Sequence, residues 1–120
     1  MIKQTFIVEK GDRGTSDFII VPNGIKNIPV KVPVLVDFDQ NMVVGEADIF
    51  RKDGIVYATA DIPEEYMNFY PAIGVRTIRK ENSEGIKKLI ESEIFSIALC
   101  SQRNADESIK SISAQSKSAI

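Results

Sequence analysis

Two stretches of the chain, Val43–Phe50 and Ile55–Ile62, flank the dipeptide Asp53-Gly54. In the second stretch an apolar side chain stands at every second position, a period that places alternate side chains on opposite faces of a β-strand. Asp-Gly readily adopts the positive φ angles of a tight two-residue turn. The segment therefore predicts an antiparallel hairpin with one buried face. In the second arm this face consists of Val56, Ala58, Ala60 and Ile62.

Other short segments rich in β-branched and aromatic residues also predict strands. Gln4–Lys10 and Asp17–Val21 form either a first hairpin or two strands joined by a loop. Val34–Phe38 and Ala72–Ile78 are expected to be strands as well. Val30–Val32 lies between two prolines, which lack a backbone donor, so we expect a sheet edge or an irregular approach there.

The remaining segments are less regular. Pro63 is followed by two glutamates and predicts a short helical turn, because proline suits the first helical position and acids suit the positive end of the helix dipole. Residues 80–88 are polar and predict a loop. Ile86–Leu99 fits both a helical stripe and an alternating strand. We favour a strand from about Glu93 to Ser101, with a helical turn leading into it as the alternative.

The totals agree with a folded β domain. The chain has 120 residues, of which 43% are hydrophobic and 27% charged, and these values are typical of one compact soluble domain. The sequence predicts a mainly β domain over residues 1–112, a small β-barrel or sandwich of about six or seven strands with one or two short helices. The end of the chain is rich in serine and lysine, so residues 113–120 predict a flexible or partner-ordered tail.

The chain contains no histidine and a single cysteine, Cys100. Histidine is the usual general base near neutral pH, so Ser-His-Asp and Cys-His catalysis within one chain is excluded. Zinc sites built from histidine or from several cysteines are excluded on the same ground. Cys100 is expected to be a small buried hydrophobe rather than a reactive thiol. The net charge of −2 gives no general attraction to nucleic acid or to anionic lipid, and neither is expected as a partner.

Four aspartates raise the question of a metal site or of acid–base chemistry. Calcium loops need about six or more oxygen ligands in a stricter pattern than these residues form, so no metal and no cofactor is predicted. An aspartate pair for acid–base catalysis is equally unsupported by the surrounding sequence. The four residues are Asp37, Asp39, Asp48 and Asp61.

Four segments in order, VPVLVDFDQNMVVGEADI, DGIVYATADIP, YPAIGVRTI and EIFSIALCSQRNADESIKSI, resemble the phage prohead (capsid-maturation) serine protease family. The resemblance covers roughly residues 30–112 and implies a protease-like barrel. In the family, the first segment carries a His-Asp pair and the last carries the serine nucleophile. Here Phe38-Asp39 and Ser96 stand at those places. Phe38 and Ser96 are therefore expected to be relic positions, because a serine hydroxyl without a base is a poor nucleophile.

The resemblance and the missing base together predict a non-enzymatic structural protein of a tailed-phage particle. It would be an auxiliary or decoration subunit, made in the host cytoplasm and bound in many copies to the major capsid protein or another virion protein. One alternative is an active capsid-maturation protease that uses Ser96 with an atypical base such as Lys87 or Lys88. Another is a scaffold or chaperone of head assembly.

Two side-chain groups are candidates for contact with a partner. The aromatic residues Tyr66, Phe69 and Tyr70 form either an exposed interface anchor or the plug of a barrel end. A basic stretch follows them, diluted by glutamates, and a solvated face is its first interpretation, before an acidic protein partner and nucleic acid. Its residues are Arg76, Arg79, Lys80, Lys87 and Lys88.

Overall fold

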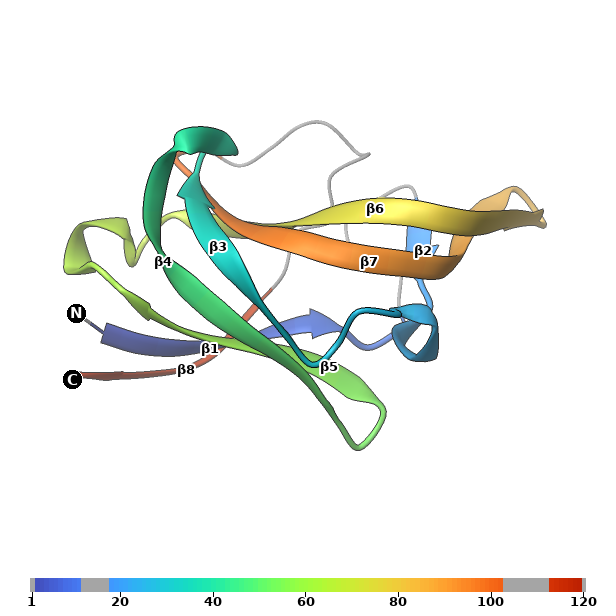
Figure 1. Ribbon diagram of the computed structural model, residues 1–120, viewed down its shortest axis with the longest axis horizontal. Helices are drawn as coiled ribbons and strands as arrows, with labels where there is room; N and C mark the ends of the chain where they lie inside the picture. Colours follow the sequence, from blue (N-terminus) through green and yellow to red (C-terminus); the bar gives the residue numbers. More distant parts are fainter. Residues whose placement is uncertain (1, 12–17, 103–112, 120) are drawn as a thin grey trace.

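The computed structural model describes residues 2–11, 18–102 and 113–119. Within these residues the fold is one curled sheet with two single 3₁₀ turns (Figure 1). The strands are β1 Ile2–Glu9, β2 Phe18–Ile20, β3 Val30–Val36, β4 Asp39–Lys52, β5 Ile55–Ile62, β6 Tyr70–Ser83, β7 Ile86–Cys100 and β8 Ser113–Ala119, and the turns are η1 Pro22–Gly24 and η2 Glu64–Tyr66.

The predicted fold class is confirmed, because the described residues are mostly strand and the sheet curls into a half-barrel. Neighbouring strands follow the order β2-β7-β3-β4-β5-β1-β8, and β6 lies along the other side of β7. β7 therefore pairs with three strands: with β6 in antiparallel fashion, and with β2 and β3 in parallel fashion. Among the described strands, β7 has the most strand partners.

The predicted hairpin over residues 43–62 is confirmed as β4 and β5. Their register runs from Ala47 opposite Ala60 to Lys52 opposite Ile55. Asp53 and Gly54 have φ angles of 54° and 78°, as a tight turn between twisted strands requires. The short helical turn expected after Pro63 is also present, as η2.

The loop predicted over residues 80–88 is wrong, and so is the helical turn considered before Glu93. β6 and β7 instead form one long hairpin whose register extends from Tyr70 opposite Cys100 to Ser83 opposite Ile86. The hairpin projects from the rest of the sheet (Figure 1). A two-stranded ribbon that meets water on both faces lacks the apolar alternation of a half-buried strand, so its sequence looks like a loop.

Two further expectations concern the N-terminal strands. The hairpin alternative for the first two segments is wrong, because β1 pairs with β5 and β8 while β2 pairs with β7. The edge expected at Val30–Val32 is confirmed: these residues begin the regular strand β3, but within the described residues they pair with β4 alone. Pro33 is tolerated there because the pairing with β7 begins only at Val34.

Strand β8 occupies the segment for which we expected a flexible or partner-ordered tail. It runs antiparallel to β1, with Ile2 opposite Ala119 and Ile7 opposite Ser113. The pairing is irregular between Thr5 and Phe6, which lie opposite Ser116 and Ala114. β1 is therefore an interior strand, flanked by β5 on one side and by β8 on the other.

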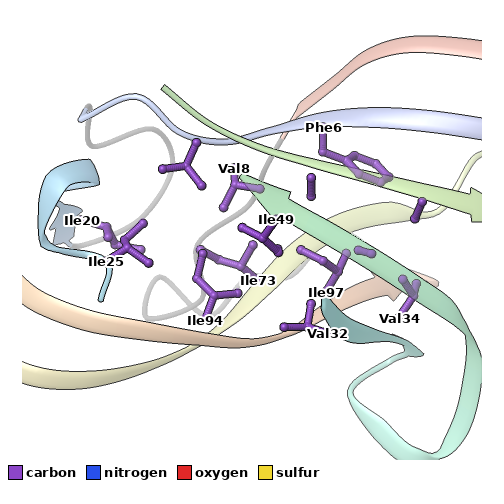
Figure 2. Close-up of a cluster of buried hydrophobic side chains, with 14 of the residues drawn as sticks. Phe6, Val8, Ile20, Ile25, Val32, Val34, Ile49, Ile73, Ile94 and Ile97 are labelled. Carbon is purple, nitrogen blue, oxygen red and sulfur yellow. The ribbon is translucent and has the colours of Figure 1, made fainter. Parts of the chain in front are cut away.

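The hydrophobic core fills the concave side of the curled sheet. Figure 2 shows side chains from opposite walls pointing toward one another, among them Phe6 of β1, Ile49 of β4 and Ile97 of β7. Ile20 and Ile25 contribute from β2 and from the residue after η1. The residues are aliphatic or aromatic and fully buried, and their removal from water is the main favourable term in folding.

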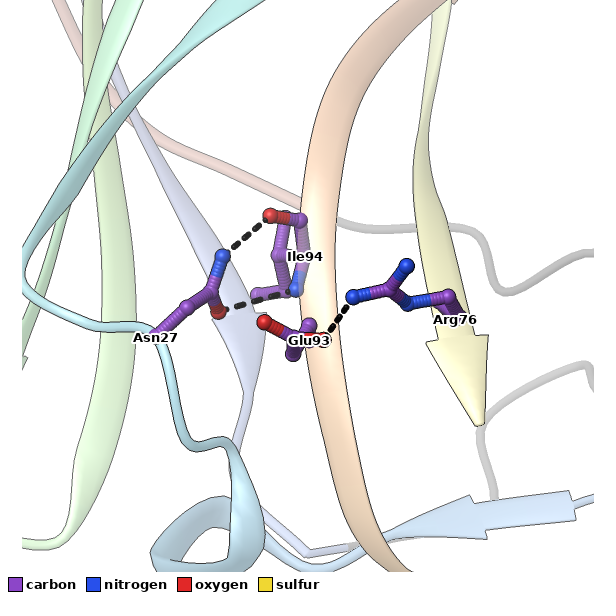
Figure 3. Close-up of polar contacts among 4 residues, drawn as sticks. All are labelled: Asn27, Arg76, Glu93 and Ile94. Atoms are coloured by element: carbon purple, nitrogen blue, oxygen red, sulfur yellow. Dashed lines mark hydrogen bonds and ion pairs between the residues drawn. The ribbon is translucent and has the colours of Figure 1, made fainter. Parts of the chain in front are cut away.

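Asn27 completes the sheet where a strand is missing. On one side of β7, β2 pairs only with residues 87–89 and β3 only with residues 97–99. In the gap, the Asn27 side chain donates from Nδ2 to the carbonyl oxygen of Ile94 at 2.7 Å and accepts from the Ile94 amide at 3.1 Å (Figure 3). The amide group thus takes the place of a neighbouring strand's backbone.

Replacing Asn27 by alanine is expected to lower the free energy of unfolding by about 1–3 kcal/mol, because it leaves an amide and a carbonyl of Ile94 without these partners. Urea denaturation followed by circular dichroism measures the change. Alanine at the exposed Asn68 is the matched control and is expected to stay within about 0.5 kcal/mol of the unmodified chain. Equal effects of the two substitutions would contradict this role for Asn27.

Candidate functional site

Ser96, the expected relic nucleophile, is enclosed within the sheet. It lies on β7 opposite Gly74 of β6, and only 1% of it is exposed. A Cβ atom added at Gly74 would stand 2.3 Å from Ser96 Oγ, so glycine is the residue that leaves room for the hydroxyl. Among the described residues Ser96 Oγ has no hydrogen-bond partner. A hydroxyl in this position is not presented to a peptide substrate.

Phe38, the other relic position, lies in the turn between β3 and β4 and has a φ angle of 59°. Its half-buried ring packs on Ala72, Ala98 and Cys100. Alternate residues of a strand share a face, so Ala98 separates Ser96 from Cys100 on one face of β7. The structure therefore brings Phe38 and Ser96 to the same face, with Ala98 between them.

The lysines considered as atypical bases lie far from Ser96 along the same strand. Lys87 and Lys88 are eight or nine positions away on β7, which at the rise of a β-strand corresponds to about 26–30 Å. Proton transfer requires hydrogen-bond distance or one bridging water. Within one copy of the chain, neither lysine can therefore act as the base for Ser96.

Asp37, next to Phe38, fastens the β3–β4 turn to the end of β7. Its carboxylate accepts hydrogen bonds from the Ser101 amide at 2.7 Å and from the Ser101 hydroxyl at 3.0 and 3.1 Å. Its own amide donates to the carbonyl oxygen of Leu99 at 3.0 Å. The sequence did not indicate Ser101 as a partner, because the contact depends on the parallel register of β3 and β7. This carboxylate stabilises a turn.

Cys100 is buried, in agreement with its expected role as a small hydrophobe. Burial raises the pKa of its thiol above the ordinary value, and the nearby Asp37 carboxylate raises it further. A thiol with a raised pKa carries little of the reactive thiolate at neutral pH. Nothing in this environment activates Cys100 as a nucleophile.

The three aromatic residues before and at the start of β6 differ in their exposure to solvent. Tyr66 and Phe69 are half-buried, pack against the main core and meet edge to face, with ring centroids 5.1 Å apart. Both rings therefore pack on the core, as the plug interpretation requires, and that interpretation stays a prediction. Tyr70 is exposed, so it alone of the three is available as an anchor for a partner.

The two arginines of the basic stretch are engaged in ion pairs on one face of the β6–β7 hairpin. Arg76 pairs with Glu93 (Figure 3). Arg79 approaches Glu91 at 3.4 Å and Glu81 at 3.9 Å. Cross-strand pairs of this kind contribute little each when exposed, but together they neutralise this face of the hairpin.

The opposite face of the hairpin carries a pocket of about 430 Å³. Lys80 and Lys87, whose nearest strand partners are Leu89 and Asn82, both line it. The turn residues Glu84 and Gly85 have φ angles of 53° and 78°, and this tight turn brings the two lysines to one site. The remaining lining residues are Phe18, Val75, Thr77, Ile78 and Leu89.

Two searches for other kinds of site gave negative results within the described ranges 2–11, 18–102 and 113–119. They contain no group of three or more histidine, cysteine, aspartate or glutamate residues that could hold a metal ion. Asp39 instead accepts a hydrogen bond from the Asn41 amide at 2.8 Å, and Asp48 pairs with Lys31 at 3.9 Å. In the same residues no helix is long and apolar enough to cross a membrane.

Comparison of the chain with protein-family models, with curated proteins and with solved structures found no match. These comparisons therefore assign no family to the chain. The resemblance of the four segments to the prohead proteases stays a prediction.

Replacing Ser96 by alanine is expected to leave the free energy of unfolding unchanged or to raise it by up to about 1 kcal/mol. The substitution removes a buried hydroxyl that has no hydrogen-bond partner among the described residues. Chemical denaturation measures the change. The paired variant Ser101→Ala keeps the amide bond to Asp37 but loses both hydroxyl bonds, and is expected to cost about 1 kcal/mol. A loss of more than that for Ser96→Ala would mean that its hydroxyl contributes to stability.

Proposed function

We propose that the chain is a non-enzymatic structural protein of a tailed-phage particle, an auxiliary or decoration subunit bound to the capsid lattice. The observation that carries the proposal is the burial of Ser96, whose hydroxyl lies against Gly74 and away from solvent. The ordered resemblance to prohead proteases supplies the phage context.

A protease of this type must expose its nucleophile beside a group that accepts a proton. The chain offers no histidine, and Lys87 and Lys88 lie far along the strand from Ser96. Loss of the base alone typically removes several orders of magnitude of rate. A chain that lacks both an exposed nucleophile and a base is better suited to a structural role than to proteolysis.

A lattice of identical capsid proteins suits a subunit of this kind. Each copy would contribute a modest contact, and a repeated surface converts many modest contacts into stable attachment. The β6–β7 hairpin projects from the rest of the sheet and could reach such a partner, and Tyr70 at its base is exposed. The curled sheet behind them would hold both in fixed positions.

Quantitative mass spectrometry of purified particles of the phage that encodes the chain tests the proposal. The expected result is a copy number comparable to that of the major capsid protein. Absence from mature particles, with presence in assembling heads, would favour the scaffold or chaperone. Incubation with the capsid precursor supplies the second arm. Cleavage that is lost in Ser96→Ala but retained in Ser101→Ala would establish the protease instead.

A further inference from the structure

We propose that the pocket between Phe18 and the β6–β7 hairpin is a docking site for an extended, acidic segment of a partner protein, which inserts an apolar side chain. The inference rests on the proposed function in one respect, namely that the chain acts by binding other proteins. Three independent features of the described residues support it: the charge at the rim, the apolar floor and the free edge of β6.

The rim carries two positive charges that no described residue balances. Lys80 and Lys87 are exposed and line the pocket, yet neither forms an ion pair within the described residues. Of the glutamates on the hairpin strands, Glu81, Glu91 and Glu93 are engaged by Arg76 and Arg79. The two ammonium groups therefore favour a ligand that brings its own carboxylates.

The floor of the pocket is apolar. Phe18 and Leu89 are buried beneath it, and Val75 is half-buried. Ile78 also lines the pocket and is 51% exposed, so it gains from being covered. A volume of about 430 Å³ is in the range of pockets that hold a compact ligand. It is large enough for a bulky aliphatic side chain and its neighbours.

The edge of β6 offers backbone hydrogen bonds beside the pocket. Within the described residues β6 pairs with β7 alone, so its other side is an open edge over Tyr70–Ser83. An extended peptide can add to such an edge as a further strand, and every second side chain then faces the pocket. This favours a peptide over an anionic lipid, which would use the lysines but not the backbone.

The same edge disfavours pairing with a second copy of the chain. Lys80 of β6 forms no ion pair within the described residues, so a second copy paired antiparallel around it would bring two like charges together. The register irregularities between Thr77 and Lys80 also interrupt a flat edge. An acidic strand would be attracted to the positive charge that repels a second copy. The edge therefore favours an acidic partner over self-association.

Nuclear magnetic resonance titration tests the site with three blocked peptides of equal length. The first alternates glutamate with isoleucine, the second lysine with isoleucine, and the third glutamate with serine. The first is expected to shift the backbone amide signals of residues 75–80 and 87–89, with affinity that falls as salt is added. Equal binding of the lysine peptide, or of the serine peptide, would overturn the proposal. So would binding of phosphatidylglycerol vesicles without binding of the first peptide.

Variants locate the site. Lys80→Glu combined with Lys87→Glu is expected to weaken binding of the first peptide about tenfold or more. Lys26→Glu combined with Lys52→Glu changes the net charge equally at exposed positions outside the pocket, and is expected to have little effect. Thr77→Phe fills the pocket without changing charge and is expected to weaken binding as well. Unchanged binding in both pocket variants would refute the site.

The outcomes separate this inference from the capsid proposal. If particles contain the chain and still take up the Lys80→Glu, Lys87→Glu variant to normal copy number, the pocket is not the docking site and the capsid proposal stands. If the peptide binds at the pocket but the chain is absent from particles and from assembling heads, the capsid proposal fails and the docking site stands.

Discussion

Alanine in place of Gly24 is expected to lower the free energy of unfolding by about 3 kcal/mol or more, an effect large enough to unfold many domains of this size. The added Cβ atom would stand 1.7 Å from the carbonyl oxygen of Ile90 and 2.8 Å from its carbonyl carbon. Both are backbone atoms of strand β7, so no side-chain rotation relieves the overlap. Either η1 or β7 has to move.

The measurement is thermal and urea denaturation of Gly24→Ala beside Gly54→Ala. Gly54 has a φ angle of 78° and nothing within 4 Å of an added Cβ atom, so it reports backbone strain without overlap. The left-handed conformation costs a non-glycine residue about 1–2 kcal/mol. A loss for Gly24→Ala no larger than that for Gly54→Ala would show that η1 does not press against β7 as described.

Alanine in place of Ile97 is expected to cost about 2–5 kcal/mol, the usual range for truncating a fully buried isoleucine. Ile97 is 0% exposed on β7 and packs among residues from both walls of the sheet (Figure 2). It also lies opposite Val34 of β3 and Ile73 of β6. Neighbouring strands therefore hold the backbone in place, and the cavity cannot readily collapse.

Ile78→Ala is the matched control, since it removes the same atoms from a side chain that is 51% exposed. Its expected change in the free energy of unfolding is within about 0.5 kcal/mol. Urea denaturation at equal protein concentration compares the two variants, and equal denaturant dependence would confirm that the same surface unfolds. Similar losses in both variants would mean that Ile97 is not at the centre of the core.

The sequence was most informative where structure depends on near neighbours. The β4–β5 hairpin follows from the alternation in Ile55–Ile62 and from the turn preference of Asp53-Gly54, and both act within a few residues. The turn η2 follows in the same way from Pro63 and the acids after it. Such signals hold wherever the strand is half-buried and its turn is tight.

The same reasoning failed where partners lie far apart in the chain. Nothing local indicates that β2 and β3 share one side of β7, or that the Asn27 side chain bridges the interval between them. The β6–β7 hairpin was missed beyond Arg79 because its polar tip has no buried face. The turn of this hairpin contains Gly85, whose φ angle of 78° is one that glycine adopts readily in tight turns.

For the candidate site, too, the sequence indicated local structure but not contacts between distant residues. Ser96 was recognised as a strand residue, but its burial depends on Gly74 standing opposite, which only the register of β6 and β7 reveals. The pairing of Lys80 with Lys87 at one pocket likewise requires that register. Whether a side chain is enclosed or presented to a ligand is a property of the assembled sheet, and periodicity alone does not contain it.

The position of β7 in the chain has a consequence for biosynthesis. A ribosome produces β2 and β3 well before residues 86–100. Both strands therefore lack a neighbour on the side of β7 until that strand is synthesised. Nascent chains of this protein thus pass through a stage in which strand borders are open to pairing with other polypeptides. Chaperones that cover those borders during synthesis are therefore expected to raise the yield of folded chain.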